Sequence, residues 1–150
     1  MTSLMTLKRM DNVAIVVEDL AAAVSFFTEL GMELEGETTV EGPSVDRVLG
    51  IDDVRSDIAM MRTPDGRGRV ELTRFQAPRA VRTEPQPIPV NALGIGRIMF
   101  AVDDIDEVLG RLRAHGAELV DEVVQYEDTY RLCYIRGPEG IVLALAQEVG

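Results

Sequence analysis

The sequence has no tryptophan, one histidine and one cysteine among its 150 residues. The single cysteine, Cys133, excludes an intrachain disulfide and favours a reducing compartment, so we expect a cytoplasmic protein. No stretch approaches the roughly 18 apolar residues of a membrane span. Residues 1–10 lack the apolar core of a signal peptide. The sequence therefore indicates neither a membrane-spanning nor a secreted protein.

Positive charge is also scarce, because 15 Lys and Arg face 26 Asp and Glu and leave a net charge of −11. Such a surface repels phosphate backbones and anionic lipids, so neither nucleic acid nor membrane is expected as a partner. A small-molecule ligand is compatible with this charge, and an anionic one needs a local arginine.

Hydrophobic residues make up 46% of the chain, enough to build the core of a single domain over residues 1–150. The chain also contains an internal repeat. Residues 12–20 (NVAIVVEDL) match residues 97–105 (RIMFAVDDI), an offset of 97 − 12 = 85. Residues 60–66 (MMRTPDG) match residues 134–140 (YIRGPEG) at an offset of 74. The shorter offset indicates that the second half has lost the equivalent of about residues 42–53.

Each half shows the pattern of a βαβββ module. An apolar strand is followed by an aspartate suited to cap a helix, Asp19 or Asp104, and Gly31 or Gly116 follows the helix. Three further strands are predicted in each half, at 32–40, 57–62 and 69–75 and at 118–125, 129–135 and 141–146. We therefore predict an α+β fold of two tandem modules, at about 10–76 and 95–148, joined by a proline-rich linker at 77–94. Helices cover the outer face, and the other face of the mixed sheet curls into a cup.

The runs DNVAIVVEDL, VELTRF, RIMFAVDDID and GPEGIVLAL, with the repeat, resemble the vicinal-oxygen-chelate superfamily of glyoxalases, bleomycin-resistance proteins and extradiol dioxygenases. The resemblance extends from about residue 10 to 148, and it implies a homodimer, because many relatives complete their cups by pairing modules. It also implies a metal site at four strand positions, which here hold Asn12, Glu71, Arg97 and Ala144. Only Glu71 is a metal ligand of the family type. A guanidinium has no lone pair and a fixed charge, so we expect no metal cofactor, and a divalent ion is the less favoured alternative.

Strand alternation places Asn12, Glu71 and Arg97 on the face that forms the cup. One interpretation is an Arg97–Glu71 ion pair that replaces the metal. The other is a catalytic or binding pair, in which Arg97 holds a carboxylate or enolate oxygen and Glu71 accepts a proton. Further residues predicted to line the ligand site are Met60, Met99, Tyr126, Arg131 and Tyr134.

Two classes of function follow, and the sequence leaves both open. In the first, the protein binds a small organic molecule without turnover, as the resistance proteins of the superfamily do. The low aromatic content of 5% weighs against a flat drug. In the second, the protein is a glyoxalase-like lyase or isomerase with Glu71 as base and Arg97 as electrostatic stabiliser. A third alternative is a dioxygenase-like metalloenzyme with atypical ligands.

Overall fold

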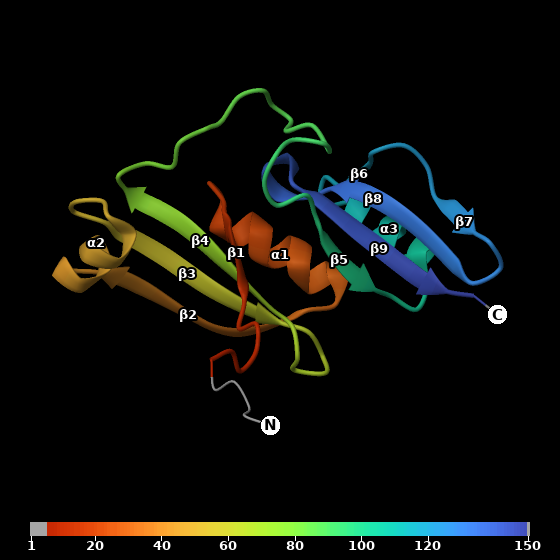
Figure 1. Ribbon diagram of the computed structural model, residues 1–150, viewed down its shortest axis with the longest axis horizontal. Helices are drawn as coiled ribbons and strands as arrows, with labels where there is room; N and C mark the ends of the chain where they lie inside the picture. The colour runs from red at the N-terminus through yellow and green to blue at the C-terminus, as the bar shows by residue number, and fades with distance from the viewer. Residues whose placement is uncertain (1–5, 150) are drawn as a thin grey trace.

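The computed structural model describes residues 6–149 and contains two β-sheets, with the helices α1 and α3 packed behind them in the view of Figure 1. The N-terminal half builds the first sheet, in the strand order β1-β4-β3-β2. The C-terminal half builds the second sheet, in the order β5-β9-β8-β6, with β7 also paired to β8. The elements of the first half are β1 (Val13–Val16), α1 (Leu20–Leu30), β2 (Glu33–Glu41), α2 (Pro43–Leu49), β3 (Arg55–Arg62) and β4 (Arg69–Ala77). Those of the second half are β5 (Ile98–Ala101), α3 (Ile105–Arg113), β6 (Glu118–Leu119), β7 (Val124–Tyr126), β8 (Tyr130–Arg136), the 3-10 turn η1 (Pro138–Gly140) and β9 (Val142–Glu148).

Both sheets are mixed, which confirms the predicted α+β fold of two βαβββ modules. In each module the first strand pairs in parallel with the last, β1 with β4 and β5 with β9, and the other pairs are antiparallel. The edge strands β1 and β5 are not hydrogen-bonded to each other, so the two sheets remain separate. The linker between β4 and β5 crosses from one sheet to the other along one side of the molecule (Figure 1).

Both long helices begin at the predicted aspartates. Asp19 Oδ1 accepts a hydrogen bond from the backbone N–H of Ala22 at 3.0 Å, and Asp104 Oδ1 accepts one from Glu107 at 3.2 Å. These contacts satisfy backbone donors that the first helical turn leaves unpaired. Gly31 closes α1 with a φ of 121°, a conformation that favours glycine.

The helices and the two sheets share one hydrophobic core. Phe27 on α1 is fully buried, and its ring centroid lies 6.5 Å from that of Phe100 on β5 of the other module. The helices also touch directly, because Arg111 Nε on α3 donates to the carbonyl oxygen of Glu29 on α1 at 3.1 Å. The two modules are therefore packed into one unit around the helices.

Strand alternation separates two faces in each sheet. On β1, Ile15 is buried against the helices, whereas Ala14 and Val16 are exposed on the opposite side. We call that opposite side the open face of each sheet. The same alternation places Arg97 and Met99 on the open face of the second sheet, as predicted.

Two local features differ from the sequence prediction. The extra segment of the first half forms the short helix α2, which begins at Pro43, a residue suited to the first helical position. The single strand predicted at 118–125 is divided into β6 and β7. The exposed acidic residues Asp121 and Glu122 lie between β6 and β7. Asp and Glu have a low propensity for strands, so pairing is interrupted at these two residues.

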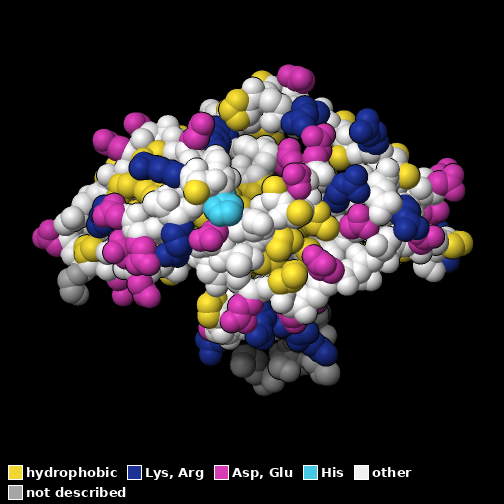
Figure 2. Space-filling model, turned by 180° about the vertical axis from the view of Figure 1, so that it is seen from behind, with side chains coloured by type: hydrophobic (Ala, Val, Ile, Leu, Met, Phe, Trp, Pro, Cys, Tyr) yellow, Lys and Arg dark blue, Asp and Glu magenta, His cyan; other side chains and the backbone are white. Residues whose placement is uncertain are grey.

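Acidic and basic side chains are interspersed over the surface seen from behind, and no large patch of one sign is present there (Figure 2). Within the described residues, no helix has the length and apolar character needed to cross a bilayer.

Candidate functional site

The open face of the first sheet carries Glu71 in the middle of β4. Its direct cross-strand neighbours are Ala14 on β1 and Met60 on β3. The hydroxyl of the buried Thr73 donates to Glu71 Oε2 at 3.1 Å, and Asn12 is exposed just before β1. Within residues 6–149, the Glu71 carboxylate has no cationic partner. Its side chain is half-buried, and within those residues its only side-chain hydrogen bond comes from the Thr73 hydroxyl.

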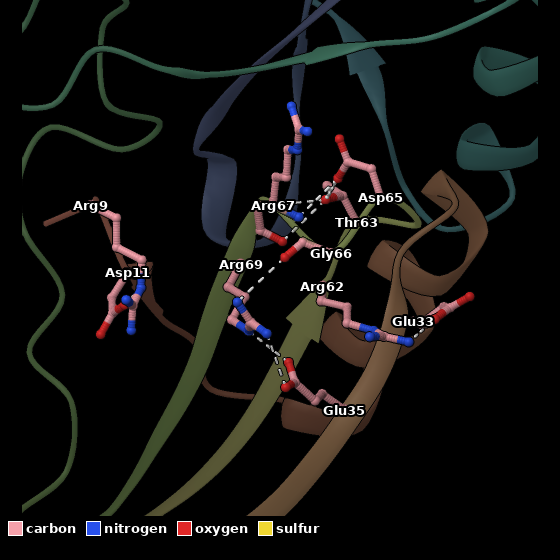
Figure 3. Close-up of polar contacts among 11 residues, drawn as sticks. Arg9, Asp11, Glu33, Glu35, Arg62, Thr63, Asp65, Gly66, Arg67 and Arg69 are labelled. Carbon is pink, nitrogen blue, oxygen red and sulfur yellow. Dashed lines mark hydrogen bonds and ion pairs between the residues drawn. The ribbon is translucent and has the colours of Figure 1, made fainter.

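The nearest arginine along the same strand, Arg69, is already paired with another carboxylate. Arg69 Nε and Nη2 bind the two carboxylate oxygens of Glu35 on β2 at 2.8 and 3.3 Å (Figure 3). These hydrogen bonds hold the pKa of Glu35 below its ordinary value and raise the pKa of Arg69. Arg62 is paired with Glu33 in the same way, at 2.8 Å. The ion pairs thus neutralise the arginines beside Glu71.

The open face of the second sheet carries Arg97 beside an aromatic ring. The guanidinium carbon of Arg97 lies 5.2 Å from the ring centroid of Tyr134 on β8, the distance of a cation–π contact. Met99, Ala144 and Tyr134 form one cross-strand row next to it. Arg97 makes no hydrogen bond or ion pair within the described part of the chain, so its donors are free for a ligand.

The strand register shows that the two open faces are equivalent. The row Ala14–Glu71–Met60 of the first sheet corresponds to the row Met99–Ala144–Tyr134 of the second. Ala144 therefore occupies the position of Glu71, whereas its neighbours Leu143 and Leu145 are fully buried on the helix-covered face.

The structure divides the predicted site between the sheets. Glu71 and Met60 belong to the first sheet, and Asn12 directly precedes its strand β1. Arg97 and Met99 belong to the second sheet or its approach. The Arg97–Glu71 ion pair is not formed, because no salt bridge joins them and Arg97 lies over Tyr134 instead. The chain therefore presents two half-sites, Glu71 on the first sheet and Arg97 at the second, with no ion pair or hydrogen bond between these two side chains.

Two predicted ligand residues lie away from Arg97. Arg131 points to the helix-covered face, where it binds Asp106 at 3.1 and 3.2 Å, so its placement in the ligand site was wrong. The pair lowers the pKa of Asp106 and raises that of Arg131. Its closeness in sequence to Tyr130 and Tyr134 was misleading, since strand alternation directs neighbouring side chains to opposite faces. Tyr126 pairs with Tyr130 at the end of β7, on the open side but exposed.

A cavity of about 340 Å³ lies where β1, the start of β5 and the linker meet. The proline-rich linker, predicted only to join the two modules, also forms a wall of this cavity. The sequence feature that points to this wall is the group of apolar residues in the linker. Of these, Ile88, Leu93 and Ile95 line the cavity and are exposed. Arg136 of β8 also reaches the cavity, where its Nη1 donates to the carbonyl oxygens of Ile88 and Gly140 at 2.5 and 2.9 Å.

The residues at the four superfamily ligand positions do not fit a divalent metal. Asn12 offers one amide oxygen and Glu71 a carboxylate, but Arg97 and Ala144 offer no lone pair. Within residues 6–149, no three His, Cys, Asp or Glu side chains are grouped so as to hold an ion. This arrangement instead provides one acceptor group on the first sheet and one donor group on the second.

Comparison with known proteins gives consistent matches. The model of the Glyoxalase/Bleomycin resistance protein/Dioxygenase superfamily matches residues 9–145. The crystal structure of a glyoxalase family protein from Bacillus cereus is 55% identical with a TM-score of 0.93, and 100% of each chain is covered. The uncharacterised protein YaeR of Escherichia coli is 26% identical over 143 residues, 95% of this chain and 98% of YaeR. The trypanothione-dependent glyoxalase I of Leishmania major is 18% identical with a TM-score of 0.64, over 94% of this chain and 87% of that one, a likeness of fold alone.

Proposed function

We propose that this chain, which belongs to the glyoxalase/bleomycin resistance protein/dioxygenase superfamily, binds a small organic molecule on the open faces of its sheets without a metal ion. The observation that carries the proposal is the donor set at the four ligand positions. Only Glu71 is a good metal ligand, and the fixed positive charge of Arg97 opposes a cation. Arg97 and Glu71 instead supply five hydrogen-bond donors and a carboxylate acceptor for an organic ligand.

Metal content provides the first test. Protein purified without a metal-binding tag, incubated with Mn²⁺, Ni²⁺ or Zn²⁺ and then dialysed, is expected to hold far less than one ion per chain by elemental mass spectrometry. Retention of about one ion per chain, lost in Glu71→Ala, contradicts the proposal and returns the chain to the metal-dependent members.

Ligand binding provides the second test. A thermal-shift screen of metabolite-sized organic acids is expected to yield compounds that raise the Tm of the wild-type protein. Arg97→Gln and Glu71→Ala are expected to lose this response. Arg67→Gln removes a charge from an exposed turn outside the site and is expected to keep it. Equal responses of all three variants place the binding elsewhere.

We further propose that two copies of the chain pair to join the half-sites. Val16 on β1 and Met99 on β5 are large apolar side chains on the open faces of the edge strands. They are 47% and 49% exposed. A second copy that packs its second sheet beside the first sheet would cover them and bring its Arg97 to Glu71. Light scattering is then expected to give twice the chain mass of 16.5 kDa.

Subunit complementation distinguishes a shared site from one within a single chain. Glu71→Ala and Arg97→Ala each remove one half-site, and each variant alone is expected not to bind a compound found in the screen. Co-refolded mixed dimers carry one intact Glu71–Arg97 combination and are expected to regain binding at up to half the sites. No recovery in verified mixed dimers contradicts the shared site.

Catalysis is the second candidate, and it is supported by the uncommitted Glu71 carboxylate beside Thr73. Such a group is suited to accept a proton from a ligand held by Arg97. The lyase or isomerase alternative predicts that a bound compound changes on prolonged incubation, as followed by NMR. Glu71→Gln is then expected to bind the compound and leave it unchanged, whereas pure binding predicts no change with either protein.

A further inference from the structure

The cavity beneath the linker is lined by apolar residues and by two arginines. Ile88, Leu93 and Ile95 of the linker form one side, and Ala14 and Val16 of β1 form the other. Leu93 is fully exposed and Ile95 is largely exposed, and both residues line this cavity. Exposed apolar residues around a concavity are characteristic of ligand sites, and its volume lies near the lower end of the roughly 300–1,000 Å³ of such sites.

The charged groups on the cavity wall are all of one sign. Arg97 and Arg136 line it, and no Asp or Glu among residues 6–149 does, although the chain has a net charge of −11. Two guanidinium groups without a carboxylate create a local positive potential that attracts an anion. The two arginines have different roles, because Arg136 binds backbone carbonyls, whereas the one polar or aromatic contact of Arg97 within the described part of the chain is with Tyr134.

Two arginines connect the linker to the modules, one beside the cavity and one further along the linker. Arg136 joins the carbonyl oxygen of Ile88 to that of Gly140 in η1. Arg82 forms ion pairs with Glu18 beyond β1 at 2.8 Å and with Glu139 in η1 at 3.7 Å. These contacts join the linker to η1, and the apolar side chains of the linker form one wall of the cavity.

Building on the proposed function, we propose that the ligand is an organic anion with an apolar body, bound beneath the linker. Its carboxylate or sulfonate group is bound by Arg97, which Tyr134 positions from below. Its apolar part lies between the linker and β1. Ligand class is thus decided by the linker and Arg97 together, and not by the sheets alone.

A matched pair of fluorescent probes tests this ligand class. The anion 1-anilinonaphthalene-8-sulfonate has an apolar body and a sulfonate, and N-phenyl-1-naphthylamine has the same body without the sulfonate. Wild-type protein is expected to bind the sulfonate probe more tightly than the neutral one in fluorescence titrations. Equal affinities, or no binding of either probe, overturn the proposal.

Substitutions of Arg97 separate the contribution of its charge to probe binding from that of the apolar walls. Arg97→Gln is expected to weaken the sulfonate probe by roughly tenfold or more and the neutral probe by less than about twofold, since a charge-assisted hydrogen bond is lost. Arg97→Lys is expected to retain part of the preference, and the control Arg67→Gln all of it. If Arg97→Gln behaves like Arg67→Gln, the anion site is refuted.

Filling the cavity tests its location. Ala92 of the linker lines the cavity, so Ala92→Phe is expected to weaken both probes, whereas Ala21→Phe on the exposed side of α1 leaves both unchanged. Unaltered circular dichroism and Tm verify the folding of each variant, and unchanged probe binding by folded Ala92→Phe refutes this location. Metal content and subunit complementation test the proposed function separately, so a failure of the probes is distinguishable from its failure.

Discussion

At the scale of single residues, the carboxyl group of Asp57 on β3 makes the stability of the protein depend on pH. Thr39 and Gln76 donate hydrogen bonds to it at 2.8 and 2.7 Å, and with Arg74 they lower the pKa of its carboxyl. A lowered folded-state pKa stabilises the protein above the unfolded value of about 3.9 and loses its effect as the pH falls through the folded value. Asp57→Asn is therefore expected to lower the free energy of unfolding in urea at neutral pH, and by less near pH 3. Asp52→Asn, at an exposed turn, is the control, and an equal loss at both pH values contradicts this linkage.

Cys133 is the second residue with an altered titration. Burial on the helix-covered face of β8 raises the pKa of its thiol, so little reactive thiolate is present near neutral pH. Native protein is expected to react very slowly with 5,5′-dithiobis(2-nitrobenzoate) and to react fully once unfolded in urea. A rapid reaction of native protein would show that the thiol is accessible.

At the scale of elements, α1 depends on its cap more than α3 does. The first and last turns of α1 carry no complementary charges, whereas α3 has Asp106 and Glu107 at its start and Arg111 and Arg113 at its end. Asp19→Ala is expected to lower the free energy of unfolding by about 1 kcal/mol, because the hydrogen bond to Ala22 is lost. Asp19→Asn keeps an acceptor and is expected to stay close to the wild type in urea titrations. Equal stabilities of the two variants contradict a capping role.

At the scale of the whole molecule, the shared core predicts that the modules unfold together. The three tyrosines, at 126, 130 and 134, all lie in the second module, and the chain has no tryptophan, so intrinsic fluorescence reports on that module. Phe27→Ala in the first module is expected to cost roughly 3–5 kcal/mol through the cavity it creates. The tyrosine transition is expected to shift together with the circular dichroism transition. Val48→Ala, at an exposed position of α2, is the control, and an unmoved tyrosine transition contradicts a shared core.

Local patterns in the sequence predicted the modules because they carry their own physical signals. Alternation in β1 and β5 identifies the buried face, and the aspartates at 19 and 104 identify the helix starts. The prediction for Arg131 did not follow alternation, which directs its side chain to the face opposite Tyr130 and Tyr134. No local pattern predicted the position of the linker, because its apolar side chains have no period and its contacts are with distant residues such as Glu139.

The sequence by itself determined the repeat and the two βαβββ modules, and the resemblance to the superfamily predicted which residues stand at its four ligand positions, among them Arg97 and Ala144. These properties depend on residue type and on spacing within one module. Only the tertiary structure decided that Arg97 lies over Tyr134 while Glu71 remains on another sheet, and that the linker forms the wall of a cavity. The reason is that these relations join residues far apart in the chain, and their geometry is set by how the two modules pack through α1 and α3 rather than by any local pattern.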